Sequence, residues 1–186
     1  KGKLRKMINN SFNVENINNR QICIEEKNQI PLDDEIYKSN MEPKSENLIL
    51  FENDLHVSTL ENILRNYKSV FIILLSNDQR KIKLSEAVLS FKQQIVLEFI
   101  KQFDNVTQID PLKLNETLVA IDQLDMIYPG VGENNDFINS FKKLNNKVIF
   151  NLVRDQDLFA WKFAKKGFFK FKENIPKINQ YVFQNY

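Results

Sequence analysis

Three apolar runs in this chain each end in polar side chains that could take part in phosphate or metal chemistry. The run VFIILLSND ends at Asn77 and Asp78, TLVAID ends at Asp122, and FFKFK ends at Lys172. If the three runs are strands of one parallel sheet, their carboxyl ends share the edge where ligands collect. We therefore expect these four side chains to converge into one pocket, with the composition of a phospho-acceptor site.

The order and spacing of these groups, over roughly residues 70–186, resemble the receiver domains of response regulators. The resemblance implies a receiver-like, flavodoxin-like fold. It also implies that Asp122 accepts a phosphoryl group, that Asp78 helps to hold Mg²⁺, and that Lys172 neutralises the phosphate.

The sequence departs from the receiver pattern at several positions. Asn77 replaces one acid of the metal-binding pair, and Asn151 or Leu152 stands where the family has its hydroxyl switch residue. Pro129 is displaced along the loop, and Glu173 replaces the proline that follows the family's lysine. Because loss of one carboxylate weakens a Mg²⁺ site, we predict a degenerate pocket with weak Mg²⁺ binding and no other cofactor.

The segment 117–153 also resembles the sulphate-transporter and anti-sigma-antagonist (STAS) domain. Regulatory members of that family carry a phosphorylated serine in a turn before an amphipathic helix. The matching turn here is Tyr128-Pro129-Gly130, which has no serine. A STAS-type regulatory module is therefore a second alternative.

The elements that must position these residues alternate between short β-rich runs and amphipathic stretches of helix length. From about residue 47 to 186 this alternation predicts an α/β domain, with a layered, mostly parallel sheet and helices on both faces. The stretch 95–100 either ends a helix or forms a short strand, and 102–115 is predicted as a loop with one helical turn. The predicted strands are 47–53, 69–77, 117–122, 147–153 and 168–172, and the predicted helices are 55–64, 84–95, 137–144, 158–164 and 175–182.

Composition excludes several classes of function. The 186 residues are 42% hydrophobic and include 15 Phe, enough to fill a core. The net charge of +2 provides no basic stripe, so nucleic acid is not expected as the main ligand. One cysteine, Cys23, and one histidine cannot form an internal disulfide or a zinc site, which favours a reducing interior such as the cytoplasm or the mitochondrion. No apolar stretch has the length of a transmembrane segment.

Residues 1–46 lack a sustained hydrophobic period and contain two prolines and many asparagines. Such a segment cannot bury enough apolar surface to fold alone. We predict an extended arm that lies on its own domain or, as we favour, on a partner protein.

The run DLFAWKFAKKGFF places Phe159, Trp161 and Phe163 on more than one face of a predicted helix. One face must enter the core, so the other meets either a neighbouring element or a partner, because aromatic anchors are favoured in interfaces. We therefore expect a non-catalytic architectural or accessory subunit of a multi-subunit protein complex, which acts through the arm and this aromatic helix. The alternatives are a signalling receiver phosphorylated on Asp122 and the STAS-type module.

Overall fold

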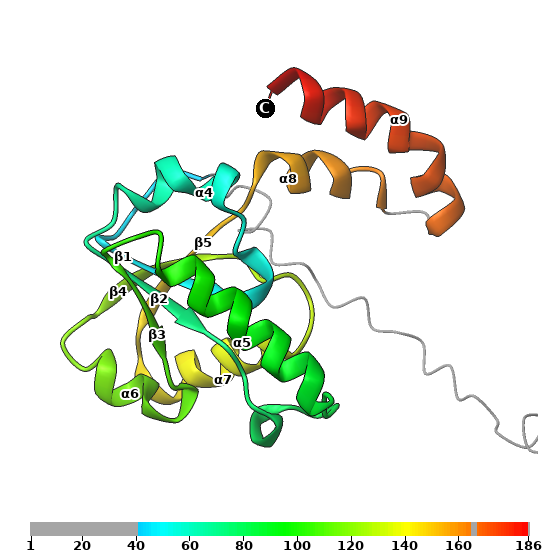
Figure 1. Ribbon diagram of the computed structural model, residues 1–186. Helices are drawn as coiled ribbons and strands as arrows, with labels where there is room; N and C mark the ends of the chain where they lie inside the picture. The colour runs from blue at the N-terminus through cyan, green and yellow to red at the C-terminus, as the bar shows by residue number, and fades with distance from the viewer. Residues whose placement is uncertain (1–40, 165–166, 186) are drawn as a thin grey trace, which may run out of the picture. The chain divides into compact units, whose positions relative to one another are not determined.

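The computed structural model describes residues 41–164 and 167–185, so most of the predicted arm lies outside the described residues. A five-stranded, all-parallel sheet has the order β3-β2-β1-β4-β5 (Figure 1). The predicted α/β class with a parallel sheet is confirmed. This order is that of doubly wound dinucleotide-binding sheets, whereas flavodoxin-like sheets have the order 2-1-3-4-5. The strands are β1 (Asn47–Phe51), β2 (Ser69–Ile73), β3 (Val106–Ile109), β4 (Gln123–Ile127) and β5 (Val148–Leu152).

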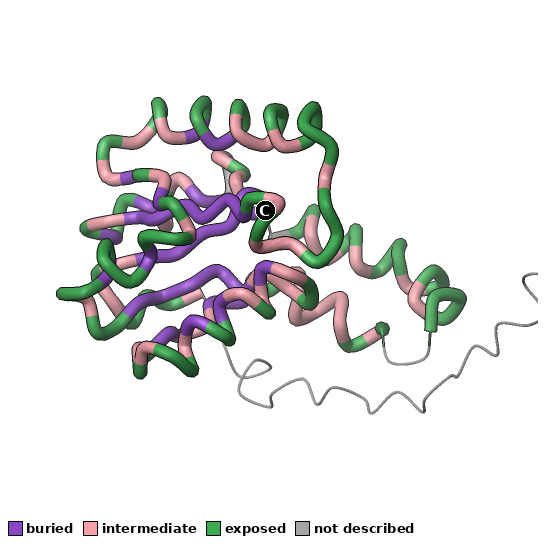
Figure 2. The backbone as a smooth tube through the Cα atoms, turned by 90° about the horizontal axis from the view of Figure 1, so that it is seen from below, coloured by how far each residue is buried: buried purple, intermediate pink, exposed green. Residues whose placement is uncertain are grey.

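Helices cover both faces of the sheet, as predicted. Leu48 and Leu50 of β1 pack with α4 and α5, whereas Ile49 and Phe51 pack with α6 and α7. Figure 2 shows the buried segments running through the strands while the outer sides of the helices are exposed. Strands buried on both faces need apolar residues at successive positions, which explains the continuous runs in β1 and β2. These helices are α4 (Val57–Leu64), α5 (Glu86–Ile100), α6 (Leu114–Thr117) and α7 (Glu133–Asn145).

Short 3-10 turns follow three of the strands and carry polar residues. η1 (Glu52–Asp54) follows β1, η2 (Asn77–Gln79) comes soon after β2, and η3 (Pro111–Lys113) comes after β3. The chain then continues beyond β5 into α8 (Asp155–Trp161) and α9 (Phe168–Asn185). Among the described helices, none is long and apolar enough to cross a membrane.

The prediction of a strand at TLVAID is wrong. Residues 114–117 form α6, and the strand begins only at Gln123. Leu118 is buried, but Val119 is 74% exposed, so the apolar run does not lie in the sheet. The true strand, QLDMI, was hidden because Asp125 interrupts its apolar pattern.

The strand prediction at FFKFK is wrong as well, because these residues begin α9. Phe168 and Phe171 continue a spacing of three and four residues through Ile175, Ile178 and Val182, which is a helical period. The run and the predicted final helix are therefore one helix of 18 residues. β3 was missed, since its four residues VTQI carry no continuous apolar signal.

The helices α8 and α9 contact each other, and α8 also contacts the α/β domain. The ring of Phe159 stacks on Tyr181 with centroids 4.1 Å apart and an interplanar angle of 5°. Trp161 meets Tyr128 edge-on at 5.8 Å, beside Val153 at the end of β5. Aromatic contacts therefore join α9 to α8, and α8 to the carboxyl end of the sheet.

Candidate functional site

Asn77 and Asp78 lie after β2, as the sequence predicts, but Asn77 is bonded to the backbone of its own loop. The side-chain amide of Asn77 donates to the carbonyl of Leu84 at 2.9 Å and accepts from its backbone N–H at 2.9 Å. This pair of bonds closes the loop from residue 77 to 84. Asp78 is exposed in η2. Asn77 therefore holds the two ends of this loop together.

Asp122 and Lys172 are not brought to the same edge as Asn77 and Asp78. Asp122 directly precedes β4, at the amino end of the strand, and its side chain is 94% exposed beside Lys147 at 3.6 Å. Lys172 is an exposed residue of α9. The expectation of a shared pocket was wrong, because the runs TLVAID and FFKFK, which end at Asp122 and Lys172, are not strands.

Phe159 and Trp161 of α8, and Phe163 just after it, are half-buried and contact other parts of the same chain. Phe159 contacts Phe163 edge-on at 5.4 Å in addition to its stack on Tyr181. Trp161 belongs to the small cluster with Tyr128. Phe159 therefore holds α9 against α8, and Trp161 holds α8 against the α/β domain, whereas the exposed phenylalanines lie on α9.

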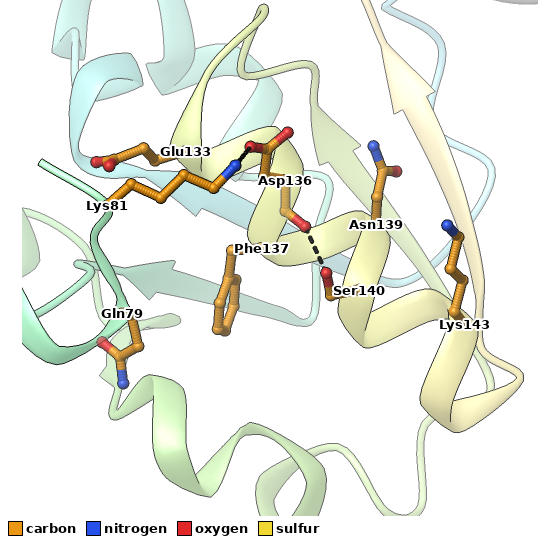
Figure 3. A pocket seen from close by; sticks show the side chains of 8 residues that line it. All are labelled: Gln79, Lys81, Glu133, Asp136, Phe137, Asn139, Ser140 and Lys143. Atoms are coloured by element: carbon orange, nitrogen blue, oxygen red, sulfur yellow. Dashed lines mark hydrogen bonds and ion pairs between the residues drawn. The ribbon is translucent and has the colours of Figure 1, made fainter.

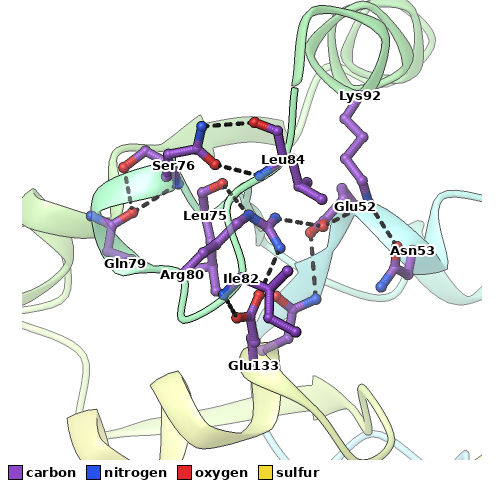
Figure 4. A network of polar contacts seen from close by, with 12 residues as sticks. Glu52, Asn53, Leu75, Ser76, Gln79, Arg80, Ile82, Leu84, Lys92 and Glu133 are labelled. Atoms are coloured by element: carbon purple, nitrogen blue, oxygen red, sulfur yellow. Dashed lines mark hydrogen bonds and ion pairs between the residues drawn. The ribbon is translucent and has the colours of Figure 1, made fainter. Parts of the chain in front are cut away.

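A buried ion network occupies the carboxyl edge between β1 and β4 (Figure 4). Glu52, whose side chain is only 1% exposed, accepts from Arg80 at 3.1 Å and from Lys92 at 3.0 Å. Asn134 donates to its other oxygen at 3.4 Å. A buried carboxylate is tolerated only when such donors replace its water, so this network fixes the end of β1.

Glu133, the first residue of α7, ties the 76–84 loop into the same network. It accepts from Arg80 at 3.2 Å and from the backbone N–H of Ile82 at 2.9 Å. The Ile82 hydrogen bond, followed by those from Lys81 and Arg80, lowers the pKa of Glu133. Arg80 also donates to the carbonyl of Leu75 at 3.1 Å, so one guanidinium joins the segment after β2 to η1 and α7.

Asp54, two residues after Glu52, is buried without comparable support. Its carboxylate lies 3.9 Å from Arg154, which pairs more closely with Asp157 at 2.7 Å. Its second oxygen, Oδ2, has no hydrogen-bond partner within the described residues. Burial raises the pKa of Asp54 to about 6, with added repulsion from Asp157 and Glu52 partly offset by Arg154. Asp54 is thus a titrating group at this edge.

Asp125 lies fully buried within β4 and anchors the segment that enters the domain. Its Oδ2 accepts from the backbone N–H groups of Lys44 at 2.8 Å and Ser45 at 3.1 Å, and from the Tyr67 hydroxyl at 2.8 Å. Burial, together with the hydrogen bond to Asp125, raises the pKa of Tyr67. Ser45 also donates to the carbonyl of Gln123 at 2.8 Å. The described end of the predicted arm is therefore bonded to the sheet.

A wider groove of about 580 Å³ lies between the 79–81 loop and the outer side of α7 (Figure 3). Lys81 and Asp136 form an ion pair across it at 2.8 Å, and the Asp136 carboxylate raises the pKa of Lys81. Both side chains are mostly exposed, and exposed pairs contribute little to binding or stability. We assign no ligand to this groove.

Sequence reasoning missed the network at the carboxyl edge. Glu52 stood inside a predicted strand, and Arg80 and Lys92 resembled ordinary surface charges. The available signal was a charged residue directly after the buried run NLILF together with Gly130 and Gly132 before a helix. Both glycines have positive φ, 75° and 143°, which turns the chain from β4 into α7.

In the part of the chain that the structure describes, no cluster of three or more His, Cys, Asp or Glu side chains could hold a metal ion. No family model, curated protein or solved structure matches this chain. The geometry of the described residues is therefore the basis for a functional proposal.

Proposed function

We propose that this protein is a non-catalytic accessory subunit that docks onto a protein partner through the helix pair α8–α9. The main support is the exposure of large apolar side chains on α9. Phe168 and Phe169, at its start, are 68% and 80% exposed, and Phe183, in its last turn, is 84% exposed. Isolated exposed apolar residues are ordinary, but three phenylalanines on one helix indicate an interaction surface.

The inner side of α9 is already occupied, which fixes the side available to a partner. Tyr181 stacks on Phe159, and the neighbouring Ile178 and Val182 are half-buried. A helix held in place by aromatic packing binds with less loss of conformational entropy than a free segment. We infer that α8 presents α9 to the partner in a preset orientation.

The charge of α9 defines the chemistry of that partner. Lys170, Lys172 and Lys177 outnumber Glu173, and Lys170 pairs with Glu173 at 2.9 Å. The remaining lysines favour a partner whose apolar groove has an acidic rim. This is the helix-in-groove mode of recognition, in which apolar side chains serve as anchors.

The arm supplies a second contact in this proposal. Residues 44–46 are held by Asp125 and by the Glu46 carbonyl, which accepts from Lys68 N–H at 2.8 Å. The residues before Met41 lie outside the description. We therefore separate the two contacts experimentally by deleting residues 1–40 and keeping the anchored segment.

Capture of the native partners tests the proposal, with the full chain as bait. We expect Phe169→Ser with Phe183→Ser to lower recovery of the partner at least tenfold. Phe91→Ser is a matched control, because Phe91 is 62% exposed but lies on α5. Circular dichroism of each bait verifies that the α/β domain is folded.

Two outcomes would overturn the proposal. Loss of the partner with Phe91→Ser but not with the α9 double variant would place the interface on α5. Binding of the full chain to anionic lipid vesicles, abolished by the double variant, would make α9 a membrane-surface helix instead. Deletion of residues 1–40 is expected to weaken capture without unfolding the domain.

A further inference from the structure

The helix α8 contacts the α/β domain where the chain leaves the carboxyl edge of the sheet. The apolar contact is a cluster of four side chains: Tyr128, Val153, Leu158 and Trp161. The polar contact is made by Arg154, the N-cap residue of α8, which reaches η1 at the end of β1. A change in the polar contact therefore acts on the seating of α8, by which we mean the packing of its first turn on this edge.

The acid of this polar contact is buried and poorly matched. Asp54 is 5% exposed, and its Oδ1 lies 3.9 Å from Nη1 of Arg154, which is longer than a hydrogen bond. The same guanidinium donates from Nε to Asp157 at 2.7 Å, so its closer bond stays within α8. The second oxygen of Asp54 has no hydrogen-bond partner within the described residues. The contact thus buries a carboxylate without replacing the hydrogen bonds of water.

The charged groups that face the Asp54 carboxylate, within the described residues, come from η1 and from the start of α8. Glu52, on the same turn, and Asp157, in the first turn of α8, both repel its ionised form. Arg154 attracts the ionised form, but this cation is shared with Asp157. The first turn of α8 therefore supplies both the repulsion and the incomplete compensation.

Two further cations and one histidine lie close by. Arg80 and Lys92 bind Glu52 at 3.1 and 3.0 Å. His56, the N-cap residue of α4, donates its backbone N–H to the carbonyl of Asp54 at 2.8 Å. Because histidine side chains ordinarily titrate between pH 5 and 8, an experiment on Asp54 must separate its titration from that of His56.

Ionisation of Asp54 opposes the seating of α8. Burial, with the repulsion from Asp157 and Glu52 and the partial offset by Arg154, raises the pKa of Asp54 to about 6. When the first turn of α8 leaves η1, water reaches the carboxylate, whose pKa then returns to about 4. Below about pH 4 the carboxyl is neutral in both states, and between about pH 4 and 6 ionisation increasingly favours the released state. Two pKa units correspond to a limit of about 100-fold.

We propose that protonation of Asp54 keeps α8 seated on the α/β domain and that its ionisation releases the first turn of α8. Because the stack of Phe159 on Tyr181 joins α9 to α8, release also changes how α9 is presented. The consequence for partner binding rests on the docking proposal, and the seated, partner-ready form is favoured at acidic pH. The release itself is a property of the isolated chain.

Hydrogen exchange of the isolated full chain at pH 4.5 and pH 7.5 tests this inference. Each measured rate is divided by the rate of an unstructured peptide at the same pH, which gives the opening constant of each amide. We expect the opening constants of residues 155–161 to be at least tenfold larger at pH 7.5, within the limit of about 100-fold. Asp54→Asn, which is neutral at both pH values, should abolish this increase and keep α8 protected.

Two matched variants should retain the increase. Asp155→Asn removes an exposed carboxylate from the same turn of α8, and His56→Gln removes the nearby histidine. Equal opening constants of α8 at the two pH values in the natural chain would overturn the proposal, because Asp54 would then be buried by elements other than α8. An increase that persists in Asp54→Asn, or that disappears in His56→Gln, would overturn it too. These measurements need no partner, so failure of the docking proposal would leave them unchanged.

Discussion

The sheet and the helix pair α8–α9 use aromatic and apolar residues in opposite ways. In the sheet, Phe51, Ile72 and Leu124 are fully buried and packed from both faces. On α9, Phe169 and Phe183 are among the most exposed large apolar residues of the described chain. Similar residue types therefore stabilise the fold in one region and remain available in the other.

Because of this difference, substitutions in the sheet are expected to change folding stability, whereas substitutions in α9 are expected to change binding. Truncating a fully buried Leu to Ala costs about 2–5 kcal/mol, whereas most surface substitutions change stability by less than about 0.5 kcal/mol. Substitutions in α9 can thus test binding without unfolding the domain. The carboxyl edge of the sheet differs from the rest of the buried layer, because its buried groups are charged. There the Glu52 ion network lies beside Asp54, whose Oδ2 has no hydrogen-bond partner within the described residues.

The largest expected effect comes from Glu52→Gln. It removes the carboxylate that neutralises Arg80 and Lys92, and breaking a buried ion network costs about 3–5 kcal/mol. Urea unfolding measures the change. Glu61→Gln, which breaks an exposed pair with Arg65, is the control and should cost less than about 1 kcal/mol. Equal losses of unfolding free energy in the two variants would show that the Glu52 network stabilises the fold no more than an exposed ion pair does.

Asp54→Asn should produce a pH-dependent gain. Because the folded pKa is raised to about 6, ionisation of Asp54 destabilises the fold as the pH rises from about 4 to about 6. A shift of about two pKa units corresponds to about 3 kcal/mol. The variant should therefore gain up to this amount relative to the natural chain above pH 6 and little at pH 4. An equal difference in stability at both pH values would contradict the assignment.

Tyr181→Ala should loosen α9 and leave the sheet intact. The ring stack on Phe159 contributes about 0.5–1.5 kcal/mol beyond its buried area. Hydrogen exchange should become faster across α9 while the amides of β1 and β2 are unchanged. Tyr181→Phe retains the ring and is the control. Faster exchange throughout the sheet would show that α9 belongs to the main core.

Phe169→Ser with Phe183→Ser has the smallest expected effect on stability, within about 0.5 kcal/mol, because both rings are already in water. Thermal unfolding of the double variant provides the measurement. A loss of several kcal/mol would mean that these rings stabilise the fold, which would remove the contrast between the two regions.

Much of the sheet could be predicted from the sequence, and its errors have identifiable causes. β1 and β2 are continuous apolar runs because they are buried on both faces. β4 was misplaced because buried Asp125 interrupts it, and its acceptance of two backbone N–H groups from residues some 80 positions earlier leaves no local signal. FFKFK fits both a short strand and the first turns of a helix, and only tertiary packing distinguishes the two.

The candidate sites were less predictable than the fold. The Glu52 network joins residues from η1, the loop after β2, α5 and α7, and its charges resemble solvated surface residues in the sequence. The expected cluster of Asp78, Asp122 and Lys172 depended on two strands that do not exist. The aromatic run of α8 lies on a helix, as expected. Its rings pack on Tyr181 and Tyr128 of the same chain, so we place the proposed partner surface on α9.

Hydrogen exchange of the chain in its native assembly, compared with the isolated full chain, tests the docking proposal most directly. We predict added protection across α9, with unchanged exchange in β1, β2 and β4. Protection that is identical in the two states along α9, or that appears only on α5, would contradict the account.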